Sequence, residues 1–209
     1  MGITEGIFQA ACTGLFVAIF LLNTGRPVKA IEVCKECSIF LNSIVVKLEE
    51  EIFNLLYIGT YTTIFRAYCL IPDHTEALIY GRKLLEIYRQ CGKKEEEGNL
   101  TILLANMYRQ HYRYLEAMEL YETAVEITKE IGDKKNEAYA NDMVGIISYH
   151  LGDYNKAKEY LEKARAIKIQ TGDKNGEASS FGNLGTVFIS LGQYEKAKEC
   201  LEKALAITI

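Results

Sequence analysis

The chain has 209 residues, of which 49% are hydrophobic and 25% are charged, with 2 prolines and 6 cysteines. This composition excludes a disordered tail, and the length allows one large domain or two small ones. The net charge of −4 argues against nucleic acid or an anionic membrane as a partner, and six scattered cysteines argue against a disulfide framework, so we expect a reducing, cytoplasmic setting.

The first predicted helix, 6–23, is nearly all apolar from residue 7 to residue 22. A signal peptide is disfavoured because the preceding segment carries Glu5 and no basic residue, and a membrane span because the run is shorter than the roughly 20 residues needed. We therefore predict a buried helix. Since it lacks the polar face of a capping helix, we expect one of its faces to expose apolar side chains from among Phe8, Phe16, Ile19 and Phe20.

The second predicted helix, 27–45, carries Cys34-x-x-Cys37, a spacing that redox and metal sites share. No second C-x-x-C or nearby histidine completes a zinc set. When this helix is aligned with the repeat described next, both cysteines fall where helices contact one another. We therefore interpret them as small buried side chains rather than as a reactive pair.

A repeat of 40 residues organises the rest of the chain. Residues 153–169 and 193–209 share 12 of 17 positions, and matching columns extend back to Ala77 and Ile64. A diverged copy precedes them, with seven extra residues around 47–51. The sequence thus predicts one domain, 1–209, built from units of approximately 1–50, 51–92, 93–132, 133–172 and 173–209.

Each unit contains two amphipathic segments with apolar residues at helical spacing. Gly132 and Gly172 are predicted to end the second helix of their units, and Asp133 and Asp173 to cap the next helix. The remaining predicted helices span 51–70, 74–90, 94–111, 114–131, 134–151, 154–171, 174–191 and 194–208.

The repeat resembles the tetratricopeptide repeat. An aromatic residue, Leu-Gly, a second aromatic residue and spaced alanines recur in the family's order, most clearly at Phe181, Leu184-Gly185, Phe188 and Ala197. The 40-residue period is most similar to the arrays of LGN/Pins polarity scaffolds and kinesin light chains. This resemblance implies an all-α, right-handed α-solenoid that binds proteins.

No pattern in the sequence indicates catalysis. His74, His111 and His150 lie near turns in separate units without metal-ligand spacing, and no phosphate-binding glycine loop or nucleophile motif occurs. We therefore expect no enzyme activity, no metal and no cofactor.

The resemblance places a peptide-binding groove on the first helix of each unit. Asparagine amides can hold a peptide backbone, and arginines can pair with carboxylates. Each of these residues could instead be a solvated surface residue. Binding of chaperone tails is disfavoured because Ile102 and Met143 stand where a lysine and an asparagine would be needed. The candidate groove residues are Arg66, Asn99, Asn106, Arg109, Tyr139, Asp142, Tyr149 and Asn183.

The sequence thus predicts a non-catalytic scaffold that binds a peptide segment or partner helix. Two alternatives stay open. In the first, the chain is the regulatory arm of a larger enzyme or signalling protein. In the second, it is a structural unit that self-associates through its apolar first helix as a homo-oligomer. Neither end has the polar cap that a repeat array needs, so we expect a fragment of a longer array or ends covered by a partner.

Overall fold

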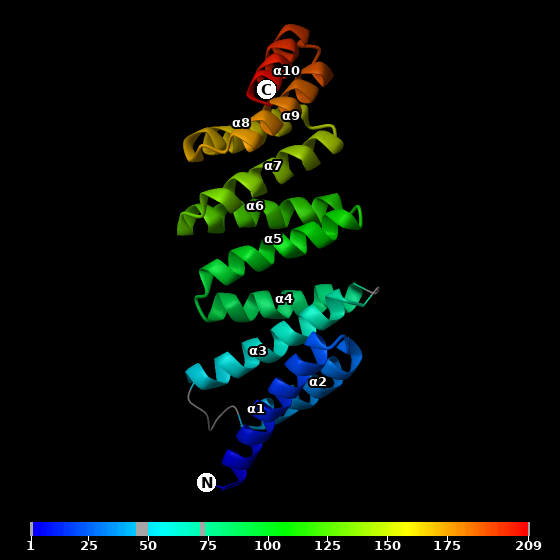
Figure 1. Ribbon diagram of the computed structural model, residues 1–209, viewed down its shortest axis with the longest axis vertical. Coiled ribbons are helices and arrows are strands. Elements are labelled where there is room, and N and C mark those ends of the chain that lie inside the picture. Colours follow the sequence, from blue (N-terminus) through cyan, green and yellow to red (C-terminus); the bar gives the residue numbers. More distant parts are fainter. Residues whose placement is uncertain (1, 45–49, 72–73, 209) are drawn as a thin grey trace. The chain divides into compact units, whose positions relative to one another are not determined.

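The computed structural model describes residues 2–44, 50–71 and 74–208, which are helical apart from short turns (Figure 1). No strand occurs in these ranges, and the predicted all-α class is confirmed. Each predicted helix matches an observed one to within four residues at either end. Residue 45 of the second predicted helix, and residues 47–49 of the predicted insertion, lie outside the described residues. The helices are α1 (Gly2–Asn23), α2 (Pro27–Ile44), α3 (Glu50–Cys69), α4 (Thr75–Gln90), α5 (Lys94–Gln110), α6 (Tyr114–Ile131), α7 (Lys134–His150), α8 (Tyr154–Thr171), α9 (Lys174–Ser190) and α10 (Tyr194–Thr208).

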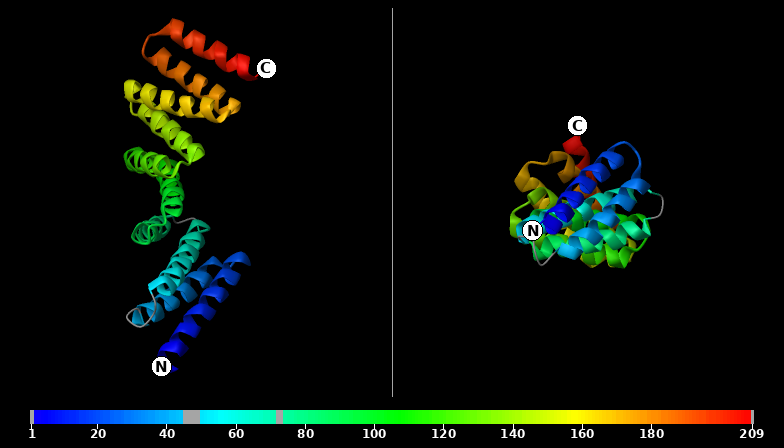
Figure 2. Two further views of the ribbon diagram at one scale, coloured as in Figure 1. Left: turned by 90° about the vertical axis from the view of Figure 1, so that its left-hand side faces the viewer. Right: turned by 90° about the horizontal axis from the view of Figure 1, so that it is seen from below.

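The chain separates into two compact units, Met1–Lys93 and Lys94–Ile209, and each is described by itself. The first holds α1 to α4, and the second holds α5 to α10. Within the second unit each helix packs against the next in chain order (Figure 2), and α7 also contacts α9. This arrangement is a helical repeat solenoid of three helix pairs. That both units form one continuous domain stays a prediction.

Turns in the second unit follow the predicted chemistry. Gly132 and Gly172 end α6 and α8 in the left-handed conformation, with φ of 78° and 72°. The carboxylate of Asp133 then accepts a hydrogen bond from the backbone N–H of Asn136 at 3.0 Å, and that of Asp173 accepts one from Gly176 at 2.9 Å. Each such cap stabilises its helix by about 1 kcal/mol.

The core of the second unit alternates small and large side chains between helices. Gly145 on α7 illustrates the need for small ones, because a Cβ built there would lie 2.7 Å from the Cγ atom of Leu161 on α8. A buried cluster joins the last three helices: Ala157, Leu161, Phe181, Leu184, Val187, Phe188, Ala197 and Cys200. The repeat columns read from the sequence are therefore packing positions.

Cys34 and Cys37 are buried in the first unit, and both thiols are free. The Cys37 sulfur lies where a Cβ on Gly14 of α1 would be, so α1 and α2 approach closely there. Burial raises the pKa of Cys34 to about 12 and also raises the pKa of Cys37. The packing interpretation of this pair is confirmed.

Helix α1 corrects the prediction of a buried first helix. Only 17% of its apolar stretch, Glu5–Asn23, is buried, because α2 and α3 cover one side of it and nothing described covers the other. The expected exposed face is confirmed, with Phe16 73% and Phe20 64% exposed. By length and composition alone, this is the one helix in the described ranges that could cross a membrane.

Candidate peptide-binding face

The first helices of the three pairs in the second unit, α5, α7 and α9, carry seven of the eight predicted groove residues. We call the surface they form the first-helix face. The eighth residue, Arg66, is exposed on α3 in the other unit.

Asn106 and Tyr139 are brought together on this face. The Asn106 Oδ1 atom accepts hydrogen bonds from the hydroxyls of Tyr139 at 2.7 Å and of Tyr121 at 2.6 Å. Burial raises the pKa of Tyr121, which keeps that hydroxyl a donor. The Asn106 Nδ2 atom donates to no described residue, so it can donate to a ligand's carbonyl.

Asn99 lies at the exposed beginning of the face. Its Oδ1 atom accepts from the Nδ2 atom of Asn136 at 3.0 Å, which links α5 to α7. Its position is compatible with groove membership, but its acceptor is already used.

Asp142 is directed into the protein. It is buried, forms an ion pair with Lys168 of α8 and also contacts the Ser180 hydroxyl of α9. Burial raises the pKa of Asp142, while Lys168 and Ser180 oppose that shift. This carboxylate therefore ties three helices together, and a ligand would have to compete with Lys168 for it.

Tyr149 and Asn183 lie on either side of an open cleft of about 210 Å³ between α7 and α9. The Tyr149 hydroxyl lies 3.4 Å from the Ser190 hydroxyl, and the Asn183 amide bonds to no side chain among the described residues. The cleft is lined by Ile146, Tyr149, His150, Leu161, Asn183, Thr186 and Val187. An apolar side chain with a nearby backbone amide fits such a lining.

Arg109 borders a second cleft, of about 180 Å³, between α5 and α7. Ile146 and His150 line both clefts, so the two are neighbours along α7. The structure therefore brings Arg109, Tyr149 and Asn183 to one continuous part of the face.

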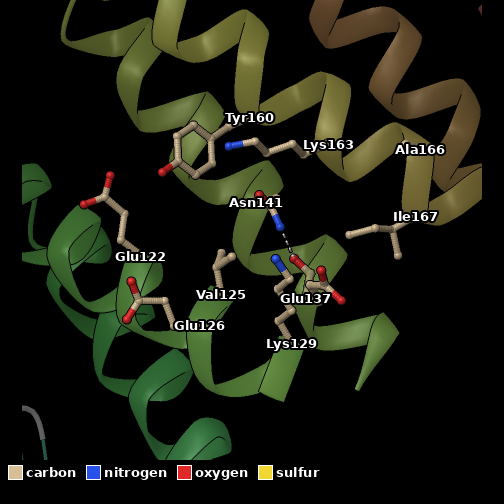
Figure 3. A pocket seen from close by; sticks show the side chains of 10 residues that line it. All are labelled: Glu122, Val125, Glu126, Lys129, Glu137, Asn141, Tyr160, Lys163, Ala166 and Ile167. Atoms are coloured by element: carbon tan, nitrogen blue, oxygen red, sulfur yellow. Dashed lines mark hydrogen bonds between the residues drawn. The ribbon is translucent and has the colours of Figure 1, made fainter. Parts of the chain in front are cut away.

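A cleft of about 620 Å³ between α6 and α8 was missed by the sequence analysis. Figure 3 shows its side chains around Asn141 of α7, whose amide donates to the Glu137 carbonyl at 2.8 Å. Glu122 at its edge pairs with Lys156 at 2.7 Å. Only the charge pattern of the second helices could have signalled it, and that pattern is also typical of a solvated helix surface.

The first-helix face presents side chains that form hydrogen bonds. Amides, phenols and one guanidinium can hydrogen-bond to a peptide. Within the described part of the chain, no group of three or more His, Cys, Asp or Glu side chains is placed to hold a metal ion.

Two tetratricopeptide-repeat family models match the chain, over residues 136–209 and 102–131. The chain belongs to the tetratricopeptide-repeat superfamily. The all-helical repeat fold of the second unit agrees with this assignment. No curated protein matches the sequence significantly.

Several solved structures share the fold at low sequence identity. A Signal Transduction ATPase with Numerous Domains from Pyrococcus horikoshii, which has a tetratricopeptide-repeat sensor, is 21% identical with a TM-score of 0.71 over 96% of this chain. This chain spans 30% of that protein's length. RapI is 17% identical with a TM-score of 0.74, covering 95% of this chain and 53% of RapI. A kinesin-light-chain-like repeat protein from Podosopora anserina is 20% identical with a TM-score of 0.63, covering 94% of this chain and 93% of that one.

Proposed function

We propose that this tetratricopeptide-repeat chain is a non-catalytic interaction scaffold, in a reducing cytoplasmic setting, that binds a peptide segment or partner helix on its first-helix face. The observation that carries the proposal is unused hydrogen-bonding capacity beside open clefts. The Asn106 Nδ2 atom and the Asn183 amide have no described partner, and the cleft between α7 and α9 lies next to Asn183. Peptide backbones and side chains supply the groups that such a surface lacks.

The test is binding of peptides selected from a random twelve-residue display library against the full chain. The variant Arg109→Ala, Tyr149→Ala, Asn183→Ala removes three groups from the first-helix face. It leaves Asn106 intact, because that residue holds two tyrosines. We expect binding to fall about ten-fold or more, since a few central residues carry most binding energy.

The matched control is Glu126→Ala, Lys129→Ala, Lys163→Ala, which changes three exposed residues of the α6–α8 cleft shown in Figure 3. This variant should bind as the unchanged chain does, and thermal melts should show both variants folded. Binding that survives the first variant in a folded protein would show that the first-helix face is not the binding site.

A second candidate function is that of a regulatory arm in a larger enzyme or signalling protein. It is favoured by the likeness to a signal-transduction ATPase of which this chain spans 30%. Its test is the transcript beyond the codon for residue 209. A following nucleotide-binding domain would support the arm, and an in-frame stop codon would leave the scaffold as the better proposal.

Self-association is a third candidate, favoured by the exposed Phe16 and Phe20 on α1. The variant Phe16→Glu, Phe20→Glu of the full chain should convert a dimer to a monomer in light scattering. A monomer from the unchanged chain would remove this candidate.

A further inference from the structure

The turn between α5 and α6 contains a tyrosine in a conformation that favours glycine. Tyr112 has φ of 59° and is the sole non-glycine residue with positive φ in the described part of the chain. The same position 40 and 80 residues later is Gly152 and Gly192, with φ of 83° and 70°. A residue with a side chain is strained in the left-handed region because its Cβ crowds the following carbonyl oxygen.

Packing within the protein does not offset that strain. The Tyr112 side chain is 79% exposed, and its ring contact is an edge-on approach to Tyr114 with centroids 6.2 Å apart. A strained, exposed aromatic residue is therefore kept where two other repeats use glycine. Strain of this kind indicates a role toward something outside the fold.

The Tyr112 turn borders a small aromatic cleft. The rings of Tyr114 on α6 and His150 on α7 stack at 5.8 Å with 7° between their planes. These two residues line the 180 Å³ cleft together with Tyr112, Ile146 and Arg109. We call these five residues the turn-edge site.

Arg109 is the charged member of this site and lacks an anionic partner. No ion pair joins it to a carboxylate among the described residues; its guanidinium hydrogen-bonds to the neutral Tyr121 hydroxyl, and its buried Nε atom has no hydrogen-bond acceptor. By contrast, Arg113 four residues later pairs with Glu116 at 2.7 Å. Because its described partners are neutral, the positive charge of Arg109 is unpaired at the edge of this cleft, where an anion can pair with it.

We propose that the turn-edge site binds a peptide segment that presents a carboxylate beside an aromatic side chain. The carboxylate pairs with Arg109, and the aromatic ring packs on Tyr112 and on the stacked Tyr114 and His150. This inference rests on the proposed function and names the chemistry of its ligand. The carboxylate belongs to an aspartate or glutamate side chain or to a peptide C-terminus.

The test uses the full chain and peptides from the random twelve-residue library, with affinity measured by fluorescence polarisation. We expect selected sequences to place an acidic group next to Phe, Tyr or Trp. Arg109→Gln should weaken their binding about ten-fold or more, and the matched Arg113→Gln should leave it unchanged. C-terminal amidation distinguishes the sources, because it abolishes binding only if the terminal carboxylate is the anion.

Tyr112→Gly separates recognition from structure. It should weaken binding about five-fold or more while raising the melting temperature, because it removes both the ring and the backbone strain. A purely structural tyrosine would instead lose stability on this change. A lower melting temperature would therefore overturn the assignment of Tyr112.

The outcomes also separate this inference from the proposed function. The turn-edge site alone is overturned if the selected peptides lack the acidic–aromatic pair and bind Arg109→Gln and Tyr112→Gly as well as they bind the unchanged chain, but no longer bind Tyr149→Ala. If the library yields no binder, or binders insensitive to every first-helix variant, the proposed function fails as well.

Discussion

Replacing Lys168 by Met should destabilise the protein far more than replacing an exposed lysine on the same helix. The side chains of Lys168 and Asp142 are 10% and 12% exposed, and their ion pair joins α8 to α7. Lys168 also donates to the Ser180 hydroxyl at 3.0 Å. Removing the lysine leaves a buried carboxylate that keeps the Ser180 hydroxyl as a hydrogen-bond donor and has the like charge of Asp173 nearby.

The expected loss is about 3 kcal/mol in the free energy of unfolding, the lower end of the range for breaking a buried pair, because Ser180 still contacts Asp142. Lys163→Met is the matched control. It breaks a 2.6 Å pair with Glu159 on the same helix, but these side chains are 50% and 61% exposed. That variant should lose no more than about 0.5 kcal/mol.

Urea unfolding followed by circular dichroism measures both losses, and the double variant Asp142→Asn, Lys168→Met tests their cause. Removing both charges should return stability to within about 1 kcal/mol of the unchanged chain. In Lys168→Met, burial raises the pKa of Asp142 without an opposing cation. A raised folded-state pKa means that the penalty is full above that pKa and shrinks as the pH falls through it.

Three results would contradict this prediction. Lys168→Met could cost no more free energy of unfolding than Lys163→Met at neutral pH, the double variant could be as unstable as the single one, or the stability loss could grow on acidification. Any of these results would show that the buried ion pair does not hold α7, α8 and α9 together.

Two further predictions concern packing. Gly145→Ala should destabilise the protein by about 1–3 kcal/mol, because its Cβ would overlap a leucine of α8. Gly182→Ala has open space around its Cβ and should stabilise the protein by about 0.5–1 kcal/mol. Equal melting temperatures for the two variants would contradict this prediction. Iodoacetamide at pH 8 should leave Cys34 and Cys37 unmodified while alkylating the partly exposed Cys91, because burial raises the pKa of both buried thiols. Mass spectrometry showing early alkylation of the buried pair would reverse its packing interpretation.

The helices, caps and core positions could be predicted because each packing position occurs in several repeats with a similar residue type. Ala157 and Leu161, for instance, recur as Ala197 and Leu201. The columns do not predict burial in α1 and α10, because one side of each contacts no described helix. Leu201 stands in a core column but is exposed on α10, and α1 is uncovered on one side for the same reason.

The sequence predicted which residues lie on the first helices, but not which side chains they bind. The repeat register places Asp142 among the groove residues, whereas its partner Lys168 lies 26 residues later on α8, where no sequence pattern singles it out. The strain at Tyr112 was likewise invisible, because the sequence shows a tyrosine in place of glycine without its φ. Long-range side-chain partners and backbone angles are set by tertiary packing, which the spacing of one helix does not specify.

Peptide binding on the first-helix face can be mapped by an amide NMR titration of the full chain with the tightest library peptide. We expect chemical-shift changes concentrated on α5, α7 and α9 around Arg109, Tyr149 and Asn183. Shifts confined to the α6–α8 cleft or to α10 would show that peptides bind elsewhere.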